Sequence, residues 1–257
     1  MMLLVKVKYK QDGTEEKVKA RAVIMGNNYR PGIDFEQNNF APCAHVTTVR
    51  MMVLCALQFG LQFKSFDVAQ AFTMGQADRR CFIGTPPGRK TSYDKHGNPL
   101  VFEILKNTYG SPAAPRRWHV EMHNSMIDFG FTQSTVDSCL YTKDSLVALV
   151  YVDDCLYTAP RGPDGNRQID MFIKHITDKF PLGDDGKQDC TSFIGMFFTW
   201  SKDHTTCAQS LNHILLLSCC RKLTSRSAEP SLLLVYLTLY LLLGIVPRTT
   251  TKKNGLS

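Results

Sequence analysis

Two adjacent carboxylates, Asp153 and Asp154, are the residues best suited to chemistry in this sequence. Strand-forming apolar residues precede them at 146–152 and follow them at 155–159, so the pattern predicts a β-hairpin with both aspartates at its tight turn. Burying these charges would be costly unless a cation neutralised them, and carboxylate oxygens are ligands that Mg²⁺ prefers. An Asp-Asp pair is also an ordinary turn sequence, so by itself it leaves both interpretations open.

A third carboxylate, Asp67, ends another strand-like segment at 61–68. The three aspartates could therefore meet at the ends of two strands. Two divalent ions held by such carboxylates, roughly 3.5–4 Å apart, form a clamp for in-line displacement at phosphorus. This chemistry suits nucleotidyl transfer.

Several short blocks surround these aspartates in a fixed order between about residues 5 and 210. They are 17–23 (KVKARAV), 66–75 (FDVAQAFTMG), 109–110 (YG), 114–118 (APRRW), 151–154 (YVDD) and 193–196 (FIGM). Each block is modest alone, but together and in this order the chain resembles the reverse transcriptases of Ty1/copia-type retrotransposons.

The resemblance implies a set of site residues. Asp67, Asp153 and Asp154 would be catalytic and, with Val68, would hold two Mg²⁺ ions, for which Mn²⁺ could substitute. The residues expected to contact the deoxynucleoside triphosphate are Lys19, Arg21, Val68, Ala71, Phe72 and Gly110, and those expected to contact primer or template are Tyr151, Val152 and Gly195. Phe72 would exclude a ribose 2′-hydroxyl.

Simpler interpretations of the same residues remain open. Lys19 and Arg21 also suit a solvated strand face. Phe72 also suits an ordinary core aromatic, and Gly110 a plain turn glycine.

The fold implied is α+β, with the palm and fingers of a right-hand polymerase, an antiparallel sheet backed by helices, and no complete thumb. Residues 1–210 would form this fingers and palm domain, truncated at its N-terminus. Residues 211–257 form a leucine-rich basic tail, which we interpret as non-native or frameshifted because the composition changes where the resemblance ends. Its apolar run at 232–246 is shorter than the roughly 20 residues that span a bilayer, so a membrane anchor is not favoured.

Two functions are compatible with these observations. The first is an RNA-directed DNA polymerase that uses an RNA or DNA template-primer and deoxynucleoside triphosphates, accompanied in a Pol polyprotein by integrase and RNase H domains. The second is a catalytically inactive relic that at most binds nucleic acid, because Ser111, Pro112 and Ala113 replace the Leu-Lys-Gln usual in the family.

Composition adds limits on class and compartment. Of the net charge of +7, residues 1–210 carry 24 Lys and Arg against 22 Asp and Glu, so nucleic-acid binding must depend on local clusters. Nine scattered cysteines without Cys-x-x-Cys spacing indicate reduced thiols, hence an intracellular protein, in the cytoplasm (virus-like particle) or nucleus and not secreted.

Apolar spacing predicts helices over 48–59, 115–129 and 167–180, with core-facing stripes and with Gly60 ending the first. Residues 91–99 should form a loop or hairpin tip. His119 and His123 lie four residues apart on the second helix, but their order with Glu121 is wrong for a zinc motif, so an exposed helix face is expected.

Overall fold

The computed structural model describes residues 1–9, 14–35, 38–201, 207–211 and 214–216. Most of the predicted tail, including the apolar run at 232–246, lies outside these residues. Within the tail, Ile214–Leu216 form a strand, β14.

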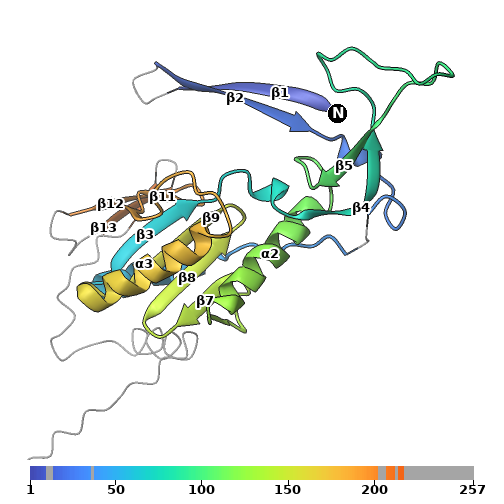
Figure 1. Cartoon of the computed structure of the whole chain (residues 1–257). Coiled ribbons are helices and arrows are strands. Elements are labelled where there is room, and N and C mark those ends of the chain that lie inside the picture. The colour runs from blue at the N-terminus through green and yellow to red at the C-terminus, as the bar shows by residue number, and fades with distance from the viewer. Residues whose placement is uncertain (10–13, 36–37, 202–206, 212–213, 217–257) are drawn as a thin grey trace, which may run out of the picture.

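A six-stranded antiparallel sheet forms the centre of the molecule, as predicted (Figure 1). Its order is β10 (Gln188–Asp189), β3 (Gln62–Asp67), β9 (Asp154–Ala159), β8 (Leu146–Tyr151), β7 (Leu140–Lys143) and β6 (Thr132–Gln133). The apolar runs at β8 and β9 are buried because this sheet is covered on both faces.

Helices α2 (Ala114–Asp128) and α3 (Pro163–Thr177) cover one face of the sheet (Figure 1). Helix α1 (Val46–Phe59) covers the other face with a four-stranded sheet. The strands of this second sheet are β11 (Ser192–Phe193), β12 (Met196–Trp200), β13 (Cys207–Leu211) and β14. The helical stripes predicted from apolar spacing are buried in these two cores, which confirms the predicted core faces.

The helix boundaries agree with the prediction except in α3. Gly60 ends α1 with a left-handed φ of 63°, and Pro115 lies in the first turn of α2. The third helix begins at Pro163 and ends at Thr177, about one turn earlier than predicted at each end. Pro163 suits a first turn, because a residue there needs no intrahelical N–H bond, and the apolar spacing could not detect that signal.

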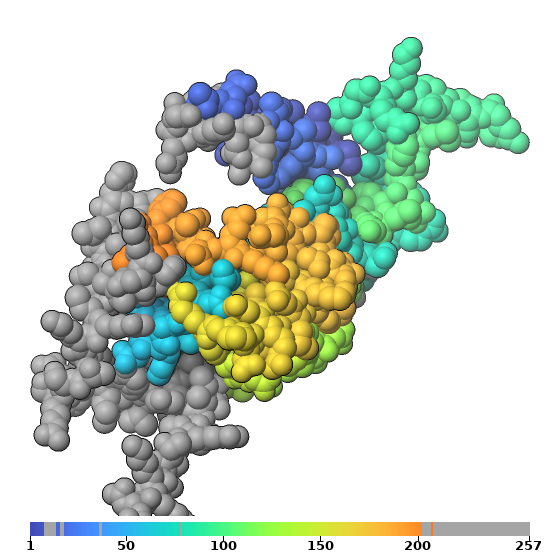
Figure 2. Space-filling model, turned by 60° about the vertical axis from the view of Figure 1, so that its left-hand side comes forward, coloured from blue at the N-terminus to red at the C-terminus, as the bar shows by residue number. Residues whose placement is uncertain are grey.

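Two peripheral β-hairpins extend from this body. One pairs β1 (Met2–Tyr9) with β2 (Glu15–Val23), and the other pairs β4 (Gln76–Ile83) with β5 (Phe102–Lys106). Open space separates the β1–β2 hairpin from the central sheet in the space-filling view (Figure 2). The predicted loop at 91–99 is confirmed as a turn closed by an isolated bridge between Tyr93 and Pro99.

The seven cysteines among the described residues are all free. Among the described residues, no helix has both the length and the apolar character needed to cross a membrane.

Candidate active site

The acidic hairpin joins β8 to β9 through a two-residue turn. Tyr151 pairs with Asp154, so the turn consists of Val152 and Asp153. Asp154 is therefore the first residue of β9, whereas the sequence analysis placed both aspartates in the turn. Val152 has a φ of 55°, a left-handed conformation that β-branched residues rarely adopt. The turn is thus locally strained at the residue that precedes Asp153.

Asp67 lies directly beside this turn. It is the last residue of β3, and its cross-strand partner in β9 is Asp154. Side chains at paired positions share one face of a sheet, with their Cβ atoms about 4.5–5.5 Å apart. The next residue, Val68, donates its backbone N–H to the Asp153 carbonyl oxygen at 2.8 Å. The structure thus brings Asp67, Asp153 and Asp154 together at one end of the sheet.

These carboxylates interact electrostatically. Burial raises the pKa of Asp154 to about 6, and the charges of Asp153 and then Asp67 add to this effect. Within the described residues, however, no group of three or more His, Cys, Asp or Glu side chains is arranged so that it could hold a metal ion. The three aspartates nevertheless offer carboxylate oxygens that a divalent cation would bind and negative charge that it would neutralise.

A segment far along the chain flanks Asp67 on its other side. Gly183 donates its backbone N–H to the Asp67 carbonyl oxygen at 2.8 Å, and Ala69 donates to the Pro181 carbonyl oxygen at 2.8 Å. A Cβ atom on Gly183 would lie 3.0 Å from Asp67 Oδ2. The sequence analysis missed this glycine, since no spacing rule connects it to Asp67.

The strained turn also has a partner in helix α2. Trp118 is buried and donates its indole N–H to the Val152 carbonyl oxygen at 2.5 Å. The sequence analysis assigned Trp118 to the core stripe, which is correct for its ring, but helical spacing says nothing about its N–H.

Two of the residues expected at the nucleotide, Arg21 and Phe72, contact the same ring, that of Tyr109. The Phe72 ring packs edge-on against Tyr109 with centroids 5.5 Å apart, and the Arg21 guanidinium lies 5.2 Å from the centre of the Tyr109 ring. Lys19 lies opposite Lys6 in the same hairpin. Both side chains are cations, and like charges directly opposite each other repel.

Ala71 and Gly110 lie in closely packed surroundings. Ala71 is buried in the core beside α2. Gly110 has a φ of 85°, and a Cβ there would lie 2.1 Å from the Ile24 carbonyl oxygen. The backbone that approaches Gly110 closely is therefore that of Ile24, which directly follows β2 at the end of the β1–β2 hairpin.

The residues predicted for primer or template lie around the acidic turn and next to it. The Tyr151 ring contacts Phe193 with centroids 6.4 Å apart. Gly195 follows Phe193 in the turn between β11 and β12, with a φ of 72° and open space where a Cβ would be.

The two α2 histidines differ from expectation. His119 and His123 are half-buried with their rings stacked at 6.3 Å, and His123 Nδ1 lies 3.1 Å from the Tyr141 hydroxyl. The expected exposed helix face is wrong, because strand β7 carries Tyr141 against this side of α2.

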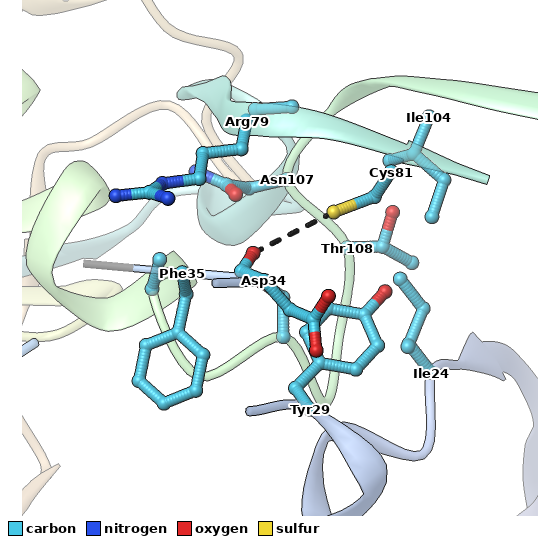
Figure 3. Close-up of a pocket in the computed structure, with 12 residues that line it drawn as sticks. Ile24, Tyr29, Asp34, Phe35, Arg79, Cys81, Ile104, Asn107 and Thr108 are labelled. Carbon is cyan, nitrogen blue, oxygen red and sulfur yellow. Dashed lines mark hydrogen bonds between the residues drawn. The ribbon is translucent and has the colours of Figure 1, made fainter. Parts of the chain in front are cut away.

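A separate pocket lies at the base of the β1–β2 hairpin (Figure 3). Its wall includes Tyr29, Asp34 and Cys81, and the Cys81 thiol lies 3.7 Å from the Asp34 carbonyl oxygen. Arg79 donates to the carbonyl oxygens of Gly32 and Ile33. No residue predicted for the site lines this pocket, so its shape alone does not indicate the chemistry.

Comparison with known families decides the identity of the chain. Residues 3–214 match the family model described as reverse transcriptase (RNA-dependent DNA polymerase). The chain belongs to the reverse transcriptase family. The predicted relationship to copia-type retrotransposons is thereby confirmed.

This reverse transcriptase chain is similar to three plant Pol polyproteins. It is 35% identical over 155 residues to the retrovirus-related Pol polyprotein from transposon RE1 of Arabidopsis thaliana, covering 59% of this chain and 10% of that protein. It is 32% identical over 175 residues to the retrovirus-related Pol polyprotein from transposon RE2 of the same plant, covering 66% of this chain and 11% of that protein. It is 31% identical over 156 residues to the retrovirus-related Pol polyprotein from transposon TNT 1-94 of Nicotiana tabacum, covering 58% of this chain and 11% of that protein. The matched part of the reverse transcriptase thus spans about a tenth of each relative.

Among solved structures, the reverse transcriptase chain is similar to telomerase from Candida albicans in complex with a fragment of telomeric RNA. The identity is 11%, the TM-score is 0.39, and the match covers 80% of this chain and 39% of that chain.

Proposed function

We propose that this chain catalyses RNA-directed DNA synthesis, in which a primer 3′-hydroxyl loses its proton, attacks the α-phosphorus of a deoxynucleoside triphosphate and displaces pyrophosphate. Asp67, Asp153 and Asp154 would hold two Mg²⁺ ions, with Mn²⁺ as a substitute. The observation that carries the proposal is the pairing of Asp67 with Asp154 across β3 and β9, with Asp153 tied to Val68 by a backbone hydrogen bond. The metal ions, when bound, would activate the attacking hydroxyl and stabilise the leaving oxygen.

The protein's own residues would bind and orient the nucleotide. Arg21 and Lys19 share one face of β2, since alternate residues of a strand point the same way. The Arg21–Tyr109–Phe72 row runs from this face towards the segment that follows Asp67. We infer that the cations bind the triphosphate and that Phe72 contacts the sugar and excludes its 2′-hydroxyl.

Backbone groups would contribute as well. The Val68 N–H is engaged by Asp153, so the carbonyl oxygen of Val68 is the atom that would serve a cation. Ala71 and Gly110 would shape the nucleotide site through the close packing of their backbones.

Template and primer would lie across the acidic turn. Tyr151 and Val152 flank Asp153 in this turn, and the Tyr151–Phe193 contact connects them with the turn at Gly195. In this arrangement the central sheet with α2 and α3 corresponds to a polymerase palm, and the peripheral hairpins correspond to fingers. Integrase and RNase H domains of a longer Pol polyprotein would act alongside this part.

Primer extension on an RNA template tests the proposal. Asp153→Asn removes one charge at the turn with little change in volume and should abolish Mg²⁺-dependent incorporation. Asp164→Asn is the matched control, because Asp164 is an exposed α3 residue that forms an ion pair with Arg167, at 3.0 Å. Equal incorporation by wild type and Asp153→Asn would refute the mechanism.

The second candidate is an inactive relic that binds nucleic acid without extending it. The described carboxylates do not form a ready three-ligand group, and Ser111, Pro112 and Ala113 replace the family's Lys- and Gln-containing segment. Metal-dependent incorporation by the wild-type chain, above that of Asp153→Asn, would exclude this candidate.

A further inference from the structure

The turn that carries Asp153 needs support from its surroundings. Val152 occupies a left-handed conformation with a φ of 55°, which is unfavourable for a valine. Such a conformation persists only where neighbouring groups hold it. The residues that hold this turn therefore also determine where the Asp153 carboxylate lies.

The side chain of Trp118, from helix α2, holds the turn peptide. The Trp118 indole N–H donates to the Val152 carbonyl oxygen at 2.5 Å, and this carbonyl belongs to the peptide that joins Val152 to Asp153. The next carbonyl, that of Asp153, accepts the N–H of Val68. The orientation of two consecutive peptides around Asp153 is thus set by two hydrogen bonds, one from α2 and one from the residue after Asp67.

Val152 is only partly buried against the core on this side. A small cavity borders Trp118 and Val152, and its wall includes His119 and Val150. Because there is space beside the turn, a directional bond is needed to fix the Val152 carbonyl.

Trp118 also touches the segment that flanks Asp67. Its ring packs edge-on against Phe180 with centroids 5.0 Å apart. Phe180 immediately precedes Pro181, whose carbonyl oxygen accepts the Ala69 N–H, and Gly183 donates to the Asp67 carbonyl oxygen. One buried tryptophan therefore contacts both the turn that carries Asp153 and the segment that flanks Asp67.

We propose that Trp118 is a positioning residue for nucleotidyl transfer, because its indole N–H fixes the strained Val152–Asp153 peptide and so sets the Asp153 carboxylate relative to Asp67. This inference rests on the proposed function. Trp118 acts through the backbone and does not touch the substrate. Misplacing a reacting group by about 1 Å can lower a rate roughly 100-fold, so a smaller shift should lower it roughly tenfold.

The chain provides a matched control. Trp200 is its other tryptophan, and its indole N–H donates to the Cys190 carbonyl oxygen at 3.3 Å in the core on the opposite face of the sheet. Trp118→Phe and Trp200→Phe both remove an indole N–H and keep an aromatic ring. We expect both to unfold at lower temperatures than wild type. Only Trp118→Phe should lower kcat, roughly tenfold, and weaken Mn²⁺ binding, while leaving the KM for dNTP nearly unchanged.

The experiment combines Mn²⁺ binding, followed by electron paramagnetic resonance, with NMR of the indole N–H groups. Trp200→Phe leaves the Trp118 signal alone in the spectrum. This signal should move when Mg²⁺ is added and should stay in place in the Asp153→Asn protein. Equal Mn²⁺ affinity and equal kcat in Trp118→Phe and Trp200→Phe would overturn the positioning role, leaving the proposed function intact.

Two further outcomes are separable. If Asp153→Asn binds Mn²⁺ as tightly as wild type, the proposed metal site fails, and the positioning role fails with it. If Trp118→Phe does not fold, a benzothiophene analogue of tryptophan at 118 in the Trp200→Phe background removes only the N–H. Unchanged Mn²⁺ affinity in that protein would overturn the positioning role, and weakened affinity would support it.

Discussion

Adding one methyl group at Gly183 should perturb Asp67 without altering any charged group. A Cβ at this position would lie 3.0 Å from Asp67 Oδ2 and 3.6 Å from the Asp67 carbonyl oxygen. Gly183 is not among the glycines with positive φ, so an alanine is compatible with the backbone. An ordinary carbon–oxygen contact needs a few tenths of an ångström more, so the carboxylate has to move by about that amount.

The expected loss of rate follows from this displacement. If about 1 Å of misplacement costs roughly 100-fold, a shift of about 0.4 Å costs roughly 5- to 10-fold. Single-turnover primer extension at saturating Mg²⁺ and dNTP measures this loss directly. Gly84→Ala is the matched control, because nothing lies within 4 Å of a Cβ there and its φ is not positive.

The reasoning is refuted if Gly183→Ala extends primers at the rate of Gly84→Ala while both proteins melt at the wild-type temperature. A lower melting temperature alone would not explain a rate loss measured well below it. The comparison therefore isolates the position of the Asp67 carboxylate from general stability.

Three other predictions concern specificity, pH and stability. Phe72→Ala should raise ribonucleotide incorporation relative to deoxyribonucleotide by about tenfold or more, measured in single-nucleotide competition, with exposed Phe197→Ala unchanged. In metal-free buffer the folded chain retains a proton on Asp154 that the unfolded chain releases, because the pKa rises from 3.8 to about 6. Stability of wild type relative to Asp154→Asn should therefore fall as pH rises from about 4 to 6 in urea unfolding, and a flat difference would contradict this. Asp137→Ala should lower the free energy of unfolding by about 3 kcal/mol, because this buried carboxylate accepts the Thr48 hydroxyl at 2.6 Å and the Cys139 N–H at 3.0 Å. A loss below about 1 kcal/mol in thermal or urea unfolding would argue against that role.

Much of the fold could be predicted because its signals are local. The helical stripes in α1 and α2 follow from a period of 3.6 residues, and Gly60 marks the end of α1. The strands around Asp153 follow from two continuous apolar runs. The start of α3 was misplaced because the decisive signal was a proline at its first turn, before the apolar stripe begins.

The partners of the acidic residues could not be predicted in the same way. Gly183 lies 116 positions after Asp67, and Trp118 lies 34 positions before Val152. Their contacts depend on how the sheet and α2 pack, and no periodicity connects them. The half-buried state of His123 has the same origin, since the Tyr141 hydroxyl comes from a strand later in the chain.

The pairing of Asp67 with Asp154 has a consequence for folding itself. The two like charges are brought opposite each other when β3 pairs with β9, before a nucleotide binds. Chain collapse in the absence of divalent salt is therefore opposed at this edge of the sheet. A cation supplied during synthesis would act as a folding aid for the same strands that it later serves in chemistry.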